Sequence, residues 1–327
     1  MRHSIGIDFS KDKLDICWLR DVQANKKKTK VFRNQRKEFG VIADWICKNT
    51  KAEPQEVLIT AEPTGIYHEA CIYFLHEQGF NIYLANPGKA KQFTQAIGLV
   101  HKTDKSDAYA LARYGADKGD LELWQPEAPE VRELKALMRR LDALEKDYQR
   151  EVNRLEASET ADVSERVLQS LHDMVAVIES EIRKLKADID DHIDRHPHLK
   201  KNRQLLASVK GVGEVVSREL TYLFAAKSFK HAKQVACYAG LIPKLQDSGK
   251  QRGRSSLSKE GPSRIRAKLY MAAIVATQHN PAIHTQYHRL LSAGKTKMQA
   301  LGAAMRKLLQ ICFGVVKNQR EYIPQAA

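Results

Sequence analysis

Four acidic residues in the first third of the chain lie where carboxylates could take part in chemistry. Asp8 lies at the end of an apolar strand pattern, where aspartate has poor β propensity, and Glu62 directly follows a second apolar run. Asp104 and Asp107 share one face of a helix predicted to reach about Tyr114. Carboxylate oxygens are hard ligands for Mg²⁺, and bound Mg²⁺ stabilises the attacking and leaving oxygens in phosphodiester chemistry. Together the four residues predict a magnesium site for that chemistry.

Each carboxylate also has a structural interpretation. Asp8 can start a turn, Glu62 can face solvent, and Asp104 with Asp107 can serve the N-terminus of a helix. The joint interpretation is favoured, because carboxylates clustered without a cation repel one another and are driven towards protonation.

A candidate hydroxyl nucleophile lies near the other end of the chain. Ser248 precedes a glycine in a stretch that begins Gly240-Leu241-Ile242-Pro243, and most Ser-Gly pairs are turns. Serine is a weak nucleophile at neutral pH and needs activation. The motif alone therefore leaves Ser248 open as a turn residue or a nucleophile.

Basic residues surround this motif. Residues 244–268 contain eight Lys or Arg against two acidic residues. Arginine matches phosphate bidentately, so this tract predicts contacts to nucleic acid. The predicted contacts are Lys250, Arg252, Arg254, Arg264, Arg266 and Lys268.

A glycine-containing turn supplies a second predicted nucleic-acid contact. Residues 205–216 have the form of a helix-hairpin-helix, in which Lys210, Gly211 and Gly213 lie between two apolar helices. Glycines permit the tight turn and leave backbone N–H groups at a helix N-terminus free to approach phosphate. The alternative is a glycine-hinged corner of an ordinary helical domain.

Composition agrees with a nucleic-acid partner. The 327-residue chain carries a formal net charge of +15, which favours a polyanionic partner over a basic enzyme that binds no nucleic acid. Five scattered cysteines without metal-site spacing predict reduced thiols and a cytoplasmic protein. No apolar run approaches the roughly 20 residues needed to span a membrane.

The elements that must position the carboxylates follow an α/β pattern. Strands are predicted at 4–8, 13–19 and 28–32, then a helix at 38–48, a strand at 57–61, a helix at 67–78 and a strand at 80–85. Three strands in hairpin order followed by alternating helices and strands predict a ribonuclease H-like domain. The basic run at 26–37 is interpreted as a solvated face, with a second nucleic-acid contact as the alternative.

The remainder of the chain reads as helical. Apolar residues recur at alternating spacings of three and four between Leu134 and Leu155 and between Leu171 and Ile189, which predicts an antiparallel helical hairpin or an intermolecular coiled coil. Packing within the chain and oligomerisation both stay open for this arm. The predicted domains are an α/β domain at 1–125, a coiled-coil arm at 126–198 and a mostly helical domain at 199–327.

Taken together, these motifs resemble one family of insertion-sequence recombinases (transposases), which use a RuvC-like DEDD domain, are guided by a bridge RNA and are related to the Piv-type DNA invertases. Its C-terminal transposase domain resembles residues 240–249 here. Its N-terminal domain resembles Gly6-Ile7-Asp8-Phe9-Ser10-Lys11, Glu62-Pro63-Thr64-Gly65-Ile66-Tyr67, Asn86-Pro87 and Lys102-Thr103-Asp104-Lys105-Ser106-Asp107-Ala108. The resemblance covers nearly the whole chain. The main departure is Pro63, where the family usually has a small residue.

The resemblance implies a role for each matching residue. Asp8, Glu62, Asp104 and Asp107 match the metal-binding carboxylates, and Ser248 matches the serine that attacks DNA and forms a covalent phosphoserine link. It further implies a composite active site across the subunits of a dimer or tetramer. A structured non-coding RNA would pair with donor and target DNA.

Two other functions remain as alternatives. The carboxylates could activate water in a magnesium-dependent, structure-selective endonuclease of the Holliday-junction resolvase type, with no covalent intermediate and Ser248 only a turn residue. The chain could also be a basic nucleic-acid scaffold whose acidic cluster is structural.

Overall fold

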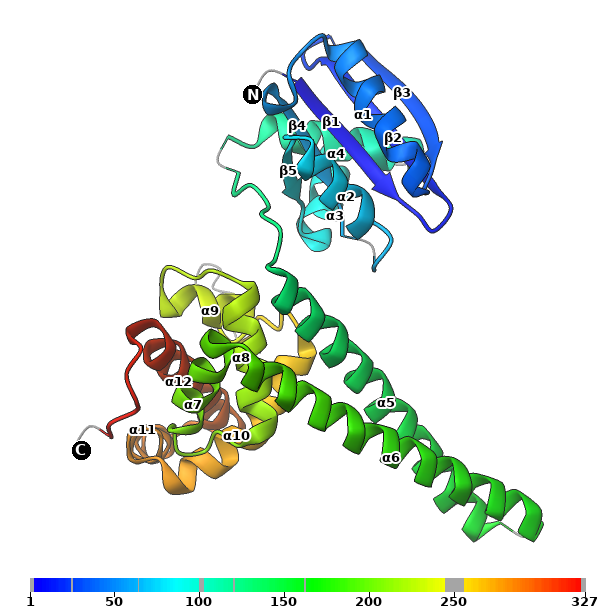
Figure 1. Cartoon of the computed structure of the whole chain (residues 1–327). Helices are drawn as coiled ribbons and strands as arrows, with labels where there is room; N and C mark the ends of the chain where they lie inside the picture. The colour runs from blue at the N-terminus through cyan, green and yellow to red at the C-terminus, as the bar shows by residue number, and fades with distance from the viewer. Residues whose placement is uncertain are drawn as a thin grey trace. The chain divides into compact units, whose positions relative to one another are not determined.

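The computed structural model describes residues 3–24, 26–63, 65–99, 103–119, 121–161, 163–244 and 256–324. The chain forms two compact units, residues 1–126 and 127–327, and each has its own hydrophobic core (Figure 1). Among the helices of the described ranges, none is both long and apolar enough to cross a membrane.

A five-stranded sheet in the order β3-β2-β1-β4-β5 forms the centre of the N-terminal unit. The strands are β1 (His3–Phe9), β2 (Lys13–Asp21), β3 (Lys26–Arg33), β4 (Val57–Ala61) and β5 (Asn81–Leu84). The first three pair antiparallel, whereas β4 pairs parallel with β1 and with β5. The predicted mixed α/β unit is confirmed, and the predicted strands and helices follow one another in the predicted order.

Helices cover both faces of this sheet (Figure 1). They are α1 (Arg36–Thr50), the short 3-10 helix η1 (Pro54–Glu56), α2 (Glu69–Glu77), α3 (Pro87–Ala96) and α4 (Asp104–Asp117). Side chains of α1 and α2 share a core with Ile5 and Ile7 of β1. The opposite face receives α4, whose Ala108 and Ala112 pack with Cys17 of β2.

Small residues let α4 lie close against the sheet. A Cβ atom on Gly6 would lie 2.0 Å from the carbonyl oxygen of Ala108, so β1 and α4 meet backbone to backbone. The Ser4 hydroxyl donates a hydrogen bond of 2.7 Å to the carbonyl oxygen of Ala112 and fixes the same contact. The close approach places the first turn of α4 at the sheet end where β1 finishes.

Helix α3 is not among the elements predicted from the sequence. Asn86-Pro87 is predicted only as the end of a strand, but the same pair begins α3. The Asn86 side chain accepts a hydrogen bond from the backbone N–H of Lys89, and Pro87 occupies the first helical position. Asparagine as N-cap followed by proline is a standard helix start.

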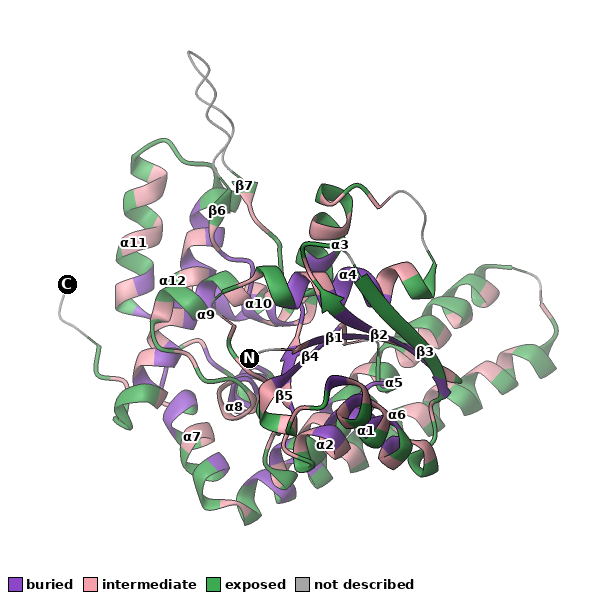
Figure 2. Ribbon diagram, turned by 90° about the horizontal axis from the view of Figure 1, so that it is seen from above, coloured by how far each residue is buried: buried purple, intermediate pink, exposed green. Residues whose placement is uncertain are grey.

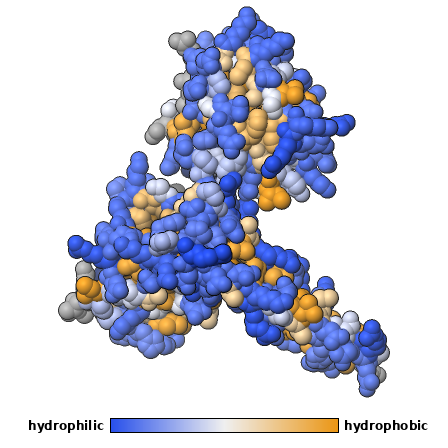
Figure 3. All heavy atoms as spheres, viewed as in Figure 1, coloured by the Kyte–Doolittle hydropathy of each residue, from blue (hydrophilic) through white to orange (hydrophobic). Residues whose placement is uncertain are grey.

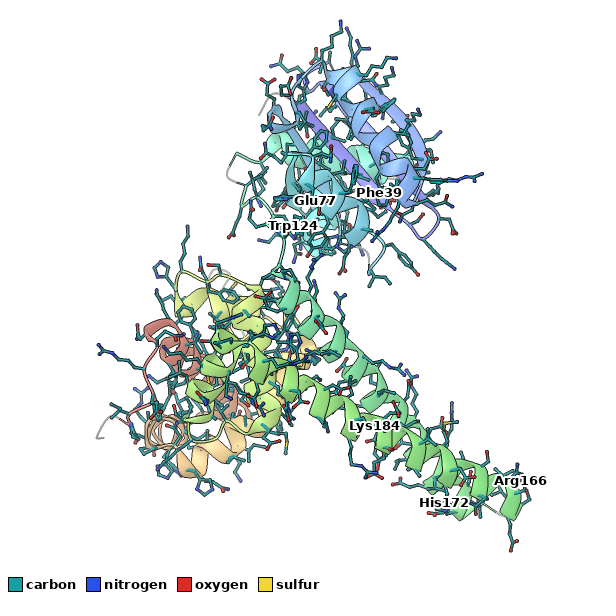
Figure 4. All side chains as sticks on the ribbon, in the orientation of Figure 1. Phe39, Glu77, Trp124, Arg166, His172 and Lys184 are labelled. Carbon is teal, nitrogen blue, oxygen red and sulfur yellow. The ribbon has the colours of Figure 1, made fainter. Side chains whose placement is uncertain are left out.

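Two long helices, α5 (Pro129–Thr160) and α6 (Glu165–Arg195), open the C-terminal unit and run side by side within one chain (Figure 1). Leu134, Met138 and Leu141 of α5 share an apolar core with Ile182 and Ile189 of α6. In Figure 4, the labelled residues Arg166, His172 and Lys184 mark the course of α6, and Figure 3 shows apolar side chains scattered among hydrophilic ones along the arm. Oligomerisation through this pair stays a prediction.

Shorter helices complete the C-terminal unit around α12. The elements are α7 (Pro197–Ala207), α8 (Glu214–Ala226), α9 (Ala232–Tyr238), β6 (Pro243–Lys244), β7 (Ser256–Leu257), α10 (Ser263–His279), α11 (Pro281–Ser292) and α12 (Lys297–Asn318). Helices α7, α8, α9, α10 and α11 all contact α12 or one another. The predicted mostly helical remainder of the chain is therefore confirmed.

Candidate active site and nucleic-acid interface

The four predicted carboxylates come from three elements at one end of the sheet. Asp8 is the next-to-last residue of β1. Glu62 directly follows β4, whose last residue Ala61 pairs with Ile7. Asp104 and Asp107 occupy the first turn of α4, which lies over β1. Parallel neighbours end at the same edge of a sheet, which is why residues 50 to 100 positions apart meet here.

Electrostatics shows that these charges act on one another. The pKa of the Asp8 carboxyl is raised from its ordinary value of 3.8 to about 6. Burial is the largest cause, and the negative charges of Asp107, Asp104, Asp15 and Glu62 contribute the rest, in that order. Like charges disfavour ionisation of a neighbour, so a cation placed here would relieve the repulsion.

The set fits a magnesium ion by donor chemistry, since hard carboxylate oxygens on rigid elements are the usual ligands. In the structure, however, the four carboxylate side chains are not grouped closely enough to form a metal site. Across the part of the chain that the structure describes, no group of three or more His, Cys, Asp or Glu side chains is close enough together to hold a metal ion. Metal binding at Asp8, Glu62, Asp104 and Asp107 therefore stays a prediction.

Two residues that the sequence analysis does not single out belong to the same cluster. Asp15 of β2 pairs with Asp8 across the hairpin and is buried. Lys13 holds its ammonium group 2.6 Å from Asp104 and 3.0 Å from Asp15, and these hydrogen bonds raise the pKa of Lys13. Lys13 therefore neutralises part of the cluster. The short turn between β1 and β2 was the available signal, because it sets the register that brings Asp15 opposite Asp8.

The predicted nucleophile lies outside the described residues. Ser248, Lys250, Arg252 and Arg254 all fall within 245–255. The described chain resumes at β7, which pairs antiparallel with β6 through Pro243 and Leu257.

Three predicted phosphate contacts already have partners inside the chain. Arg264 lies 2.7 Å and Lys268 lies 3.2 Å from the carboxylate oxygens of Glu219, whose side chain is only 4% exposed. Arg266 donates hydrogen bonds to the carbonyl oxygens of Ala239 and Gly261. These three side chains hold helices and loops of the C-terminal unit together, and a phosphate would have to compete with those partners.

The predicted glycine turn is tightly supported. Gly211 has φ of +100°, and a Cβ atom there would lie 2.6 Å from the Cβ of Ala276. The fully buried Asn280 donates to the carbonyl oxygen of Lys210 at 3.2 Å and accepts from the hydroxyl of Tyr322 at 3.0 Å. The turn between α7 and α8 is therefore a rigid feature. Its contact with nucleic acid, through Lys210, Gly211 and Gly213, stays a prediction.

Two family models match the chain. The model for the IS110 DEDD transposase domain, described as "Transposase", matches residues 5–158, which include the four carboxylates. The model described as "Transposase IS116/IS110/IS902 family" matches residues 203–288, which include Ser248.

Proteins of similar sequence are named for DNA inversion or for insertion elements. The "Pilin gene-inverting protein" of Moraxella bovis is 31% identical over 97% of each chain, and that of Moraxella lacunata is 30% identical over the same shares. The IS900 42 kDa protein of Mycobacterium paratuberculosis is 26% identical over 46% of this chain and 37% of its own. A solved structure titled "T. thermophilus RuvC in complex with Holliday junction substrate" covers 38% of this chain and 100% of its own, at 17% identity. Its TM-score of 0.27 is too low to establish a shared fold.

Proposed function

Because the chain belongs to the IS116/IS110/IS902 family of transposases, we propose that it is an RNA-guided DNA recombinase that cuts and rejoins strands through a covalent serine–DNA link. The observation that carries the proposal is the carboxylate cluster, where the pKa of Asp8 is raised to about 6. A purely structural cluster gains nothing from placing Asp104, Asp107 and Glu62 around a partly buried carboxyl group.

The carboxylates are proposed to hold Mg²⁺ through Asp8, Glu62, Asp104 and Asp107. Bound there, Mg²⁺ would supply charge stabilisation for the reacting phosphate. Asp8 on β1 and Asp104 on α4 sit on elements joined by the backbone contact at Gly6, so the donors are positioned by rigid parts of the fold. Lys13 holds Asp104 and Asp15 in place through its ion pairs and offsets part of the negative charge of the cluster.

Ser248 is the proposed nucleophile. Its hydroxyl oxygen attacks the scissile phosphorus, the bond from phosphorus to the leaving DNA oxygen breaks, and the serine proton leaves to solvent or base. The phosphodiester is thereby conserved as a phosphoserine bond. A free DNA hydroxyl can attack that bond and release the serine, so rejoining needs no external energy source.

Base pairing is the proposed source of sequence choice. A structured non-coding RNA would pair with donor and target DNA, while the protein contacts phosphates that carry no sequence information. The net charge of +15 supports such contacts. In a dimer or tetramer, one subunit would supply Ser248 and another the carboxylates.

Denaturing gels test the proposal directly. Donor and target DNA, guide RNA and Mg²⁺ are incubated with the protein, and a protein–DNA adduct is expected. Ser248→Ala should abolish the adduct, whereas the matched hydroxyl control Ser256→Ala should retain it. Mixing Ser248→Ala with Asp8→Asn protein should restore the adduct if separate subunits supply the two groups.

The same gels separate the other functions. Free cut ends without an adduct, formed equally well by Ser248→Ala, would establish a hydrolytic junction-resolving endonuclease instead. That alternative draws support from the carboxylates, which all lie within residues 1–126 and need nothing from the other unit to activate water. If no DNA is processed and Asp104→Ala binds nucleic acid normally, the chain is a scaffold.

A further inference from the structure

The outer strand of the N-terminal sheet carries an unusual density of positive charge. We define the β3 strip as Lys26, Lys27, Lys28, Lys30 and Arg33, all of which are exposed. Figure 2 shows β3 as exposed along nearly its whole length beside the buried strands β2 and β1. Alternate residues point to opposite faces of a strand, so the strip presents cations on both sides of the sheet edge.

Charge within the N-terminal unit is concentrated on and around this strip. Residues 20–37 hold 8 of the unit's 19 Lys and Arg and a single acidic residue, Asp21. The other residues of the unit carry 11 Lys or Arg against 15 Asp or Glu. Outside the strip region the unit is therefore net acidic and repels a polyanion, although its carboxylate cluster is proposed to act on one.

Three cations of the strip are held in place but not neutralised. The ammonium of Lys27 lies 4.2 Å from the ring centre of Tyr109, that of Lys30 lies 4.6 Å from the ring of Phe32, and that of Lys28 donates to the side-chain oxygen of Asn49 at 2.6 Å. Cation–π contacts orient a lysine and leave its charge intact. Within the described residues, no strip cation forms an ion pair with a carboxylate.

Strand register connects the strip to the carboxylate cluster. Val31 of β3 pairs with Asp15, which pairs in turn with Asp8, so all three lie in one row across the sheet. Arg33 pairs with Lys13, the residue that holds Asp104. From Arg33 the strip runs away from the cluster for about 23 Å, at roughly 3.3 Å per residue. That length corresponds to about seven nucleotides at 3.4 Å each.

We infer that the β3 strip is a track for the phosphodiester backbone of a nucleic-acid strand that leads to the carboxylate cluster. The inference rests on the proposed function, because the strip would supply the positive charge that guides a nucleic-acid strand to an acidic catalytic cluster. Lysines on an edge strand also prevent sheets from pairing edge to edge. Edge protection alone does not account for the extension of the charge through Arg33, Arg36 and Lys37, beyond the lysines of the strand, at the end nearest the cluster.

Salt-dependent binding tests the inference in the full-length protein without divalent metal. The test variant is Lys26→Gln, Lys27→Gln, Lys28→Gln and Lys30→Gln together. The matched control neutralises four exposed lysines of the same unit outside β3, namely Lys48, Lys51, Lys89 and Lys91. A variant with arginine at the four strip positions keeps the charge. Anisotropy measures the affinity for an RNA strand and a DNA strand of one sequence between about 50 and 200 mM salt.

The strip variant should reduce the slope of log affinity against log salt by about 2 to 3, at roughly 0.7 for each phosphate that the protein no longer neutralises. The matched control should change it by less than about 1, and the arginine variant should match the wild type. An effect on RNA alone assigns the track to the guide, an effect on DNA alone assigns it to the substrate, and equal effects assign it to the shared backbone. If the strip variant and the control give equal salt slopes, the inference is wrong. Increased self-association of the strip variant in that case would show that the lysines serve only to protect the sheet edge.

This measurement is independent of the proposed chemistry. It needs neither Mg²⁺ nor Ser248 and is repeated in the Ser248→Ala background. An unchanged slope together with normal adduct formation would reject the strip and keep the recombinase. A changed slope together with no adduct in any condition would keep the strip and reject the recombinase.

Discussion

Glu219 and Asp8 are both carboxylates held by regular elements, but their surroundings are opposite. Glu219 of α8 is buried and bonded to the cations of Arg264 and Lys268. Asp8 of β1 faces other carboxylates, which together with burial raise its pKa to about 6. A buried charge with partners of opposite sign specifies how helices pack. A carboxyl surrounded by like charge costs stability, and such arrangements cluster at sites of chemistry.

The distribution of charge along the sequence sharpens this contrast. Residues 199–327 carry 23 Lys or Arg against 5 acidic residues, whereas the helical arm at 126–198 carries 12 against 18. The two regions meet at the base of the arm, where Arg218 of α8 makes two hydrogen bonds of 2.6 Å with Asp190 of α6. Part of the basic charge of the C-terminal unit therefore serves its own assembly, and only the remainder is available to nucleic acid.

The largest effect is expected for Glu219→Ala. Removing the buried carboxylate leaves Arg264 and Lys268 without their partner, which should cost about 3–5 kcal/mol of unfolding free energy. All three tryptophans lie in the N-terminal unit, at positions 18, 45 and 124 (Trp124 is labelled in Figure 4). Fluorescence excited where tryptophan absorbs and tyrosine does not therefore reports that unit alone. The denaturant midpoint followed by helical circular dichroism should fall, while the fluorescence midpoint stays constant.

An exposed pair provides the control for this variant. Glu179→Ala breaks the ion pair with Arg183 on α6, where both side chains are at least half exposed. It should change the unfolding free energy by less than about 0.5 kcal/mol. If Glu219→Ala behaves like Glu179→Ala, the buried pair does not hold the C-terminal unit together.

Gly6→Ala should have the next largest effect, in the other unit. The added Cβ would lie 2.0 Å from the carbonyl oxygen of Ala108, so α4 would have to move off β1 at a cost of about 1–3 kcal/mol. The fluorescence midpoint should fall. Gly40→Ala is the matched control, because its Cβ meets nothing within 4 Å inside helix α1 and should stabilise the unit by about 0.5–1 kcal/mol. Equal effects of the two would exclude a tight β1–α4 contact.

Local patterns in the sequence were sufficient to predict the strands of the sheet. They also predicted that Asp8 and Glu62 lie at the ends of strands. They were not sufficient for the ion pairs of Arg264 and Lys268 on α10, two residues predicted as phosphate contacts. Their partner, Glu219, is 45 residues away from Arg264 in sequence, on α8. The available signal was an acidic residue within an apolar helix, since a buried carboxylate requires a cation. Contacts between helices depend on packing that no local spacing encodes.

Asp8→Asn should stabilise the N-terminal unit in a pH-dependent manner. The folded-state pKa of Asp8 is raised to about 6, so the folded state binds the proton more tightly than the unfolded state does. Stability from this group is full below about pH 4, is lost as pH rises towards 6, and stays lost above it. At pH 7, Asp8→Asn should gain about 1 kcal/mol after allowance for solvent screening, and almost nothing at pH 4. Fluorescence-monitored denaturation at both pH values measures the difference.

Adding Mg²⁺ to the same denaturation experiment tests whether the cluster binds the ion. If the cluster binds Mg²⁺, the ion should raise the fluorescence midpoint of the wild type at pH 7 and have a much smaller effect on Asp8→Asn, since a ligand that binds only the folded state stabilises it. Chelation with EDTA should reverse the gain. An equal response to Mg²⁺ in both proteins would place the metal elsewhere.

A similarly small effect is expected at the turn between α7 and α8, where a neutral hydrogen-bond network takes the place of ion pairs. Tyr322→Phe removes the hydroxyl that donates to Asn280, whose amide in turn donates to the carbonyl oxygen of Lys210. The loss of one such bond should lower the unfolding free energy measured by circular dichroism by about 1 kcal/mol. The unfolding free energy measured by tryptophan fluorescence should not change. Tyr270→Phe is the matched control, because Tyr270 packs against the same core and no hydrogen bond from its hydroxyl is observed in the described residues. If Tyr322→Phe also weakens nucleic-acid binding while Tyr270→Phe does not, the network positions the Lys210 turn for phosphate; loss of stability without loss of binding would limit it to folding.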